Sequence, residues 1–300
     1  MSHRVGYCCI NTALSKKKIL TGRTMRQATF KEQGISHASQ LALQNAQDLV
    51  KIIQWNHENN ISLFRIGSGM FPWGTEYNLT DLPDYQAIAD TLYSAGELVM
   101  RYGHRVSAHP DHFVKLGSLQ PHVRENSKKE LELHAIVFDL MGLPQDYRCP
   151  INIHVGMNFS QQVIDNWIQS YSELSPGVQR RLVVENDDKA TGFSVQQLYD
   201  NLHKKIYIPI TFDYFHHQFH PDDLTTREAA VLATYTWKGF TPLFHYSESK
   251  AVNEHLDVNP RAHSDLVFQQ INDFGLDLDI DLEAKLKEQA VFQYLKLAHV

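Results

Sequence analysis

Histidines and acidic residues recur at the ends of short apolar runs throughout this sequence. His109, His154 and Glu185 end three such runs, and Asp213 and His245 stand at or near the ends of two later ones. Imidazole nitrogens and carboxylate oxygens are the usual ligands of zinc, manganese and iron. Two or three such ions can hold the attacking and leaving oxygens of a phosphodiester and activate water at neutral pH. These residue types therefore indicate metal-assisted hydrolysis if the fold brings them together.

The full set of candidate metal ligands is larger than these five residues. The predicted ligands are Glu76, His109, His154, Glu185, Asp213, His216, His245, His263 and Glu283. A single histidine in an apolar run is more often a hydrogen-bonded core residue, and a single carboxylate more often caps a helix. Metal-type residues at seven successive run ends are a rarer coincidence, so we favour the metal site. We expect Glu185, His109, His245 and Glu283 to act in catalysis.

These side chains can converge only if the apolar runs are parallel strands of one sheet. Residues 181–188 place three apolar residues before an acidic cluster, which is typical of a strand buried on both faces. Similar runs cover residues 5–10, 61–66, 104–110, 151–155, 208–213, 242–246 and 276–283, with helical patterns between them. Eight strand–helix alternations predict an α/β fold, a single (β/α)₈ TIM barrel spanning residues 1–300. All candidate ligands would then face the mouth formed by the carboxyl ends of the strands.

Local signals set the expected boundaries of several helices. Ser127 and Glu130 form a capping-box pattern at the start of a helix, and Ser160 is placed to cap the next one. Apolar spacing predicts another helix around residues 266–271. The polar stretch 11–39 is the longest predicted loop, and loops of that length are usually functional or disordered.

Composition limits the classes of protein to consider. The 300 residues carry a net charge of −6, and 43% of them are hydrophobic, as in ordinary globular proteins. No apolar run approaches the roughly 20 residues of a membrane span, and we see no signal peptide. The three cysteines form no CxxC motif and fit a reducing compartment, so we expect a cytoplasmic protein. We also expect a monomer without membrane contact. The acidic charge argues weakly against DNA binding, but bound metals neutralise carboxylates locally, which leaves room for a basic rim.

Ten short motifs occur in an order that resembles one known family. They cover residues 6–11, 23–26, 64–68, 107–110, 152–156, 184–187, 213–217, 244–247, 261–265 and 283–288. The chain resembles the ultraviolet damage endonuclease (UVDE) family, which is related to the endonuclease IV and xylose isomerase-like barrels. The resemblance implies a metal-dependent DNA repair endonuclease that is associated with the nucleoid. Such an enzyme nicks double-stranded DNA immediately 5′ to cyclobutane dimers or 6-4 photoproducts, and in some members at abasic sites.

The resemblance also implies which residues contact damaged DNA. The predicted DNA-binding or lesion-binding residues are Tyr7, Asn11, Lys17, Arg26, His112 and Phe113. Tyr7 and Asn11 match residues that line the lesion pocket in the family. His112 and Phe113 replace a Gln-Tyr pair that probes the hole left by the flipped lesion, and both can still stack on bases. The basic residues of the 11–39 stretch are expected to follow the DNA backbone.

Two further positions depart from the pattern of the family. Glu76 stands where a histidine is usual, and a carboxylate favours harder ions such as Mn²⁺, which we expect at two or three ions per chain. Leu243 stands where the family usually has a lysine, which bridges metals in some members. Because leucine cannot bind a metal, one alternative is a damaged-DNA-binding protein with impaired catalysis. A second alternative is a metal-dependent sugar isomerase-type barrel, which shares strand-end ligands but predicts a small enclosed pocket.

Overall fold

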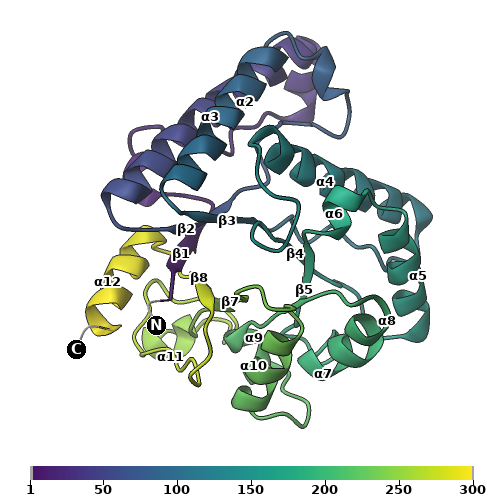
Figure 1. Cartoon of the computed structure of the whole chain (residues 1–300), viewed down its shortest axis with the longest axis vertical. Helices are drawn as coiled ribbons and strands as arrows, with labels where there is room; N and C mark the ends of the chain where they lie inside the picture. Colours follow the sequence, from purple (N-terminus) through teal and green to yellow (C-terminus); the bar gives the residue numbers. More distant parts are fainter. Residues whose placement is uncertain (1–2, 299–300) are drawn as a thin grey trace.

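Eight parallel strands form the centre of the molecule and are surrounded by helices (Figure 1). The computed structural model describes residues 3–298. The strands are β1 (Val5–Cys8), β2 (Leu63–Ile66), β3 (Arg105–Ala108), β4 (Ile151–His154), β5 (Leu182–Glu185), β6 (Ile210–Thr211), β7 (Leu243–Tyr246) and β8 (Asp279–Leu282). They pair in the order β6-β5-β4-β3-β2-β1-β8-β7. A parallel bridge between Asp213 and His245, just after β6 and within β7, brings the two edges together. The predicted (β/α)₈ barrel is confirmed.

The helices lie outside the strands and alternate with them along the chain. They are α1 (Thr12–Ser15), α2 (Gln27–Glu58), α3 (Tyr85–Arg101), α4 (Pro121–Leu140), α5 (Gln161–Ser172), α6 (Pro176–Gln179), α7 (Val195–Leu198), α8 (Lys204–Ile206), α9 (Tyr214–Phe219), α10 (Thr226–Tyr235), α11 (Lys250–Asn253) and α12 (Glu288–Ala298), with short helical turns at Leu79–Asp81 and Tyr199–His203. Among residues 3–298, no helix combines the length and the apolar character needed to cross a membrane.

Alternate residues of each strand point into the barrel, and contacts between strands that are not neighbours prove it. Arg105 of β3 donates to the Asp279 carboxylate of β8 at 2.9 Å, and Ser107 donates to Asp281 at 3.2 Å. β2 and β1 lie between β3 and β8 in the sheet, so these contacts must cross the barrel interior. Inward and outward residues continue to alternate along these strands, so His109 and Glu283 are also at inward positions. It therefore aims every second strand residue, including those at the strand ends, toward the barrel axis.

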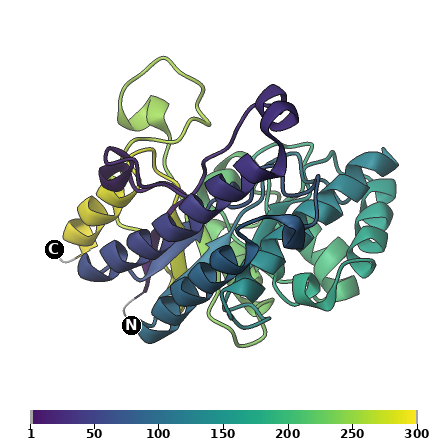
Figure 2. The same ribbon diagram turned by 90° about the horizontal axis from the view of Figure 1, so that it is seen from above.

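The longest connecting segments project from the side of the barrel that is formed by the carboxyl ends of the strands. In Figure 2 the segment around α11 and the start of α2 both project on the side opposite the N-terminus. α2 packs against α3, and its buried residues Leu49, Ile52 and Ile53 belong to the shell between helices and strands. Burying each such side chain stabilises the fold by about 1.5–3 kcal/mol. This apolar shell keeps the strand ends fixed around the mouth.

Three local predictions about helices were wrong. α2 begins at Gln27, so much of the predicted 11–39 loop is helical, with a break at Gly34 where φ is 64°. α4 begins at Pro121, and Ser127 lies inside it, where its hydroxyl accepts from the Lys115 amide and donates to the Val123 carbonyl. Residues 266–271 form no helix. Their backbone amides at 268 and 269 donate instead to a buried carboxylate, that of Glu248. Such long-range partners cannot be read from local spacing.

The prediction that Ser160 caps a helix is confirmed. Its side-chain oxygen accepts from the Val163 amide at the start of α5. Gly103 and Gly142, two residues after the ends of α3 and α4, both have positive φ, as helix-terminating residues often do.

Candidate metal centre

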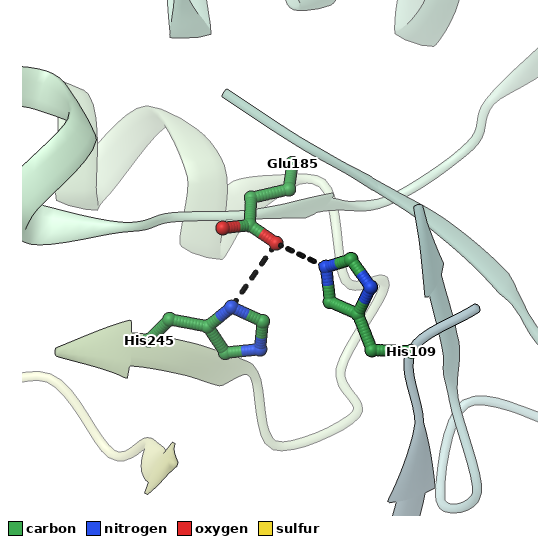
Figure 3. Close-up of side chains that lie close together, drawn as sticks. All are labelled: His109, Glu185 and His245. Carbon is green, nitrogen blue, oxygen red and sulfur yellow. Dashed lines mark hydrogen bonds and ion pairs between the residues drawn. The ribbon is translucent and has the colours of Figure 1, made fainter. Parts of the chain in front are cut away.

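Glu185, at the end of β5, is the point on which the predicted ligands converge. Its side chain is fully buried, and two imidazoles from other strands approach the same carboxylate oxygen (Figure 3). The Oε2 atom lies 3.2 Å from His109 Nε2 and 3.0 Å from His245 Nδ1. Their ligand atoms all lie within 4.8 Å of one another. β3, β5 and β7 therefore deliver one ligand each to a common point.

A second group of ligands shares the same glutamate. Glu185 Oε1 lies 3.3 Å from His216 Nδ1 and 3.7 Å from His154 Nε2. These three residues also place their ligand atoms within 4.8 Å of one another. One carboxylate oxygen thus faces each pair of imidazoles, which is the arrangement of a carboxylate that bridges two cations.

Three further predicted ligands adjoin these groups. Asp213 Oδ2 lies 3.8 Å from His216 Nδ1, while Oδ1 caps α9 by accepting from the His216 amide at 2.8 Å. Glu283 Oε1 lies 3.4 Å from His245 Nδ1. The Nδ1 atom of His263 lies 3.7 Å from Glu283 Oε2 and 2.9 Å from the Glu283 carbonyl oxygen. Eight of the nine predicted ligands are therefore linked by contacts of 3.8 Å or less.

The donor set fits divalent cations. Within residues 3–298, Glu185 Oε1, Asp213 Oδ2 and His245 Nδ1 are buried atoms without a hydrogen bond of good geometry. Buried polar atoms are rarely left unsatisfied, so such a group calls for an explanation. Carboxylate oxygens and imidazole nitrogens pointing at a shared space are the ligands of manganese, zinc or iron. Cations held by the two ligand groups would satisfy these three atoms.

Burial and neighbouring charges shift the pKa values of the residues in this centre. Burial would raise the pKa of Glu185, but His245 and His154 hold it well below its usual range. Burial would lower the pKa of His154, but Glu185 and Asp187 raise it to about 9. Burial, together with the charges of Glu185 and Glu283, raises the pKa of Asp213. His154 thus holds a proton that a cation would replace, which couples metal binding to proton release.

Sequence reasoning did not assign a role to two buried residues that hold these carboxylates. Arg65 of β2 places its guanidinium 2.5 Å from Glu283 Oε1 and 3.4 Å from Asp281 Oδ2. Asn152 of β4 donates to Glu185 Oε2. The sequence could have indicated both residues, because the alternation of inward and outward side chains places Arg65 and Asn152 at inward positions of their strands.

A family model and several known proteins match the chain. The model described as UV-endonuclease UvdE matches residues 3–300. The chain belongs to the UvdE family. Relatives include the UV-damage endonuclease of Schizosaccharomyces pombe, 33% identical over 97% of this chain and 50% of that protein. Another is the UV DNA damage endonuclease of Clostridium perfringens, 27% identical over 94% of this chain and 68% of that protein. The chain spans about half the length of its Schizosaccharomyces pombe and Neurospora crassa relatives.

Solved structures agree with this assignment. The crystal structure of SacUVDE has a TM-score of 0.85 and 26% identity, covering 99% of this chain and 98% of that one. Endonuclease IV from Thermus thermophilus gives a TM-score of 0.58 at 14% identity, covering 84% of this chain and 93% of that one. D-psicose 3-epimerase from Clostridium cellulolyticum H10 gives 0.52 at 12% identity, covering 78% of each chain. The last two similarities show a shared barrel fold only.

The structure does not bring Glu76 to the UvdE ligand cluster. Its side chain is exposed and lines an outer groove beside Lys128 and Glu132 of α4. The turn after β2 directs it there, because Trp73 takes φ of 58° and its carbonyl accepts from the Glu76 amide at 2.9 Å. The Trp73 indole also donates to the Met25 carbonyl at 3.0 Å, which holds the turn against the start of α2. The prediction of Glu76 as a ligand is therefore wrong for this structure.

Tyr7 and Asn11 do not line an open pocket in this UvdE chain. Tyr7 is fully buried on the outward face of β1, and its hydroxyl donates to Asn56 of α2 at 2.7 Å. The Asn11 amide donates to the Tyr7 hydroxyl at 2.9 Å, and its oxygen caps α1 by accepting from the Leu14 amide. Both side chains are used to join α1 and α2 to the barrel. Their predicted contact with a lesion is not available in this conformation.

The other four predicted DNA-binding residues are accessible. Lys17, Arg26, His112 and Phe113 are all exposed. His112 also lines a cavity of about 320 Å³ that opens directly on His109, His154 and His216. His112 therefore stands at the entrance to the metal centre, and Phe113 lies beside it on the loop after β3.

Leu243 lies inside the barrel, one inward position before His245. It is buried with Leu63, Val183 and Trp237 in a small apolar cluster. The position where the family usually has a lysine thus contributes to packing here and offers no ligand atom.

Proposed function

We propose that this protein is a metal-dependent DNA repair endonuclease that nicks damaged double-stranded DNA immediately 5′ to ultraviolet photoproducts. Its substrates would be cyclobutane pyrimidine dimers and 6-4 photoproducts, with abasic sites as a further class. The observation that carries the proposal is the sharing of Glu185 by two pairs of imidazoles at the barrel mouth. The names of the UvdE relatives support the same substrate class.

Each residue of the centre would have a distinct part in this reaction. Glu185 would bridge two positions, one held by His109 and His245 and the other by His154 and His216. Asp213, Glu283 and His263 would complete the ligand set. Divalent ions bound there, Mn²⁺ in our proposal and two per chain at these positions, would polarise the scissile phosphate and activate the attacking water.

Arg65 would hold Glu283 in place and balance the negative charge of the carboxylates. Its guanidinium is buried and contacts both Glu283 and Asp281, so its positive charge is fixed beside the centre. Such preorganised charge needs no rearrangement during the reaction. We assign direct catalytic roles to Glu185, His109, His245 and Glu283.

DNA would approach across the loop that carries His112 and Phe113. Their rings meet edge to face at 6.0 Å, and Phe113 is 53% exposed. A planar pair at the mouth can stack on bases next to a lesion, where pairing is already weakened. Lys17 and Arg26, both exposed, would contact the backbone without reading sequence.

A nicking assay on supercoiled plasmid irradiated with ultraviolet light tests the proposal. We expect conversion to the open circle with Mn²⁺, none with EDTA, and none on unirradiated plasmid. The variant E185Q should bind irradiated DNA but not nick it. Binding to irradiated DNA without nicks by the wild type would support the impaired damage-binding protein instead. Neither binding nor nicks would point to the sugar isomerase.

A further inference from the structure

The loops that follow β4 and β5 meet beside His154, on the open side of the metal centre. The Phe159 amide donates to the Thr191 carbonyl at 2.7 Å, and the rings of Phe159 and Phe193 lie 5.1 Å apart. Between these contacts and the barrel lies Asp187, two residues after Glu185. Asp187 also lines the cavity that opens on His154 and His216.

Asp187 and Glu185 contact opposite nitrogens of the same imidazole. His154 Nδ1 lies 3.2 Å from Asp187 Oδ1, an ion-pair contact whose angles fall short of a well-aligned hydrogen bond. His154 Nε2 faces the other way and lies 3.7 Å from Glu185 Oε1. An imidazole that ligates a metal through one nitrogen usually donates through the other to a carboxylate, which sets its tautomer and ring orientation.

The position of Asp187 is fixed by its own loop. Its backbone amide donates to the Phe193 carbonyl at 2.8 Å, and its Oδ2 accepts from the Phe193 amide at 2.8 Å. The loop also closes tightly on it, because a Cβ at Gly192 would lie 2.6 Å from the Asp187 Cβ. Oδ2 is therefore used inside the loop, and only Oδ1 is directed at the imidazole.

We propose that Asp187 is a positioning residue that holds the Nδ1 proton of His154 and thereby leaves Nε2 free to ligate a divalent cation shared with Glu185 and His216. The inference rests on the proposed function, because it concerns the same centre. It assigns a role to a residue outside the ligand set, and it explains why an acidic residue is locked in a loop at the mouth.

The substitution Asp187→Asn tests the tautomer directly. The asparagine oxygen can still accept from the Phe193 amide, so its NH₂ group turns toward His154. An NH₂ group facing His154 requires an unprotonated Nδ1. The proton of the neutral imidazole then lies on Nε2, which can no longer ligate the cation. We expect D187N to weaken Mn²⁺ binding at this position by about 10–100-fold, measured by isothermal titration calorimetry.

The matched control is Asp188→Asn, which changes the next residue of the same loop. Asp188 is paired with Arg261 at 3.0 Å. D188N should bind Mn²⁺ like the wild type. The double variant D187N/H154Q should bind no more weakly than H154Q alone, since both act on the same ligand. Equal affinity of D187N and the wild type, or additive losses in the double variant, would overturn the inference.

A spectroscopic measurement keeps the test valid if D187N folds poorly. In wild-type protein with ¹⁵N-labelled histidine and bound Zn²⁺, the His154 ring should show a protonated Nδ1 and a metal-bound Nε2. A proton on Nε2 would contradict the role of Asp187 while leaving the proposed function intact. A wild type that binds no Mn²⁺ would remove both proposals together.

Discussion

The backbones of Asp213 and His245 form the parallel bridge that brings the two edges of the barrel together. The His245 amide also donates to the Phe212 carbonyl at 3.0 Å, next to this bridge. Both residues belong to the ligand cluster, so the barrel closes at the point where the ligands gather. Metal binding and the closing of the barrel should therefore depend on each other.

Mn²⁺ should stabilise the folded chain against unfolding. A ligand that binds only the folded state at 100 times its dissociation constant adds about 2.7 kcal/mol. We expect the melting temperature to rise with Mn²⁺ concentration and to return after EDTA treatment, as measured by calorimetry. The E185Q variant should lose most of this increase, because both ligand groups share Glu185. If Mn²⁺ raised the melting temperature of E185Q as much as that of the wild type, the ions would bind at a site that does not include Glu185.

Removal of the aromatic pair at the mouth should weaken binding to damaged DNA. Stacking contributes about 1–3 kcal/mol per base, so the variant H112A/F113A should lose about 5- to 150-fold in affinity for an oligonucleotide with one cyclobutane dimer. Its Mn²⁺ affinity should not change, since neither residue contacts the ligands. Fluorescence anisotropy measures the first quantity and calorimetry the second.

Tyr235 offers the matched control for this pair, because it is an aromatic side chain on α10 that is 71% exposed. Y235A should bind damaged DNA like the wild type. Equal losses in Y235A and H112A/F113A would show that the pair has no special contact with the lesion.

The exposed Lys17 and Arg26 should set part of the salt dependence of DNA binding. Removing one contact between a basic side chain and a phosphate reduces the slope of log K against log[salt] by about 1. K17A and R26A should each do so on irradiated and unirradiated DNA alike. K204A is the control, since Lys204 is exposed but paired with Asp200 on the outer shell. An unchanged slope in K17A and R26A would exclude the backbone contact.

His104 should make the protein less stable in mild acid. Burial, together with the charges of His57 and Arg4, lowers the pKa of His104 from 6.5 to about 4. As the pH falls below 6.5, His104 is protonated in the unfolded chain before it is protonated in the folded one. The contribution of neutral His104 to the free energy of unfolding is therefore complete above pH 6.5 and is lost between pH 6.5 and pH 4. The half-buried position reduces the full shift to an effect of about 1–2 kcal/mol.

The variant H104F keeps a ring beside Tyr102 and removes the titrating group. Urea unfolding at pH 7 and pH 4.5 should show a smaller loss of stability for H104F than for the wild type. Parallel losses in the two proteins would mean that His104 does not carry the effect.

The sequence was most informative where a strand carries its ligand directly. His154, Glu185 and His245 lie in their strands and His109 directly follows one, all at inward positions. The alternation of inward and outward residues and the shared barrel mouth were therefore enough to predict that they converge. Asp213, two residues after β6, also lies beside this cluster, where it caps α9.

Failures occurred where loop geometry or long-range packing decides the position of a side chain. Glu76 lies ten residues beyond the end of β2, and a left-handed Trp73 turns it outward. Tyr7 faces α2 because its neighbours Gly6 and Cys8 take the inward positions, and Asn56, forty-nine residues away, accepts its hydroxyl. Arg65 was overlooked because its partner Glu283 is 218 residues distant. Sequence spacing alone contains none of this information.

The most direct test of the account is an anomalous difference map from crystals grown with Mn²⁺. We predict two peaks at the barrel mouth, one between His109 and His245 and one between His154 and His216, each about 2.0–2.2 Å from a Glu185 oxygen. Peaks that do not contact Glu185, or a map without peaks at the mouth, would contradict the central claim that this carboxylate joins two cations.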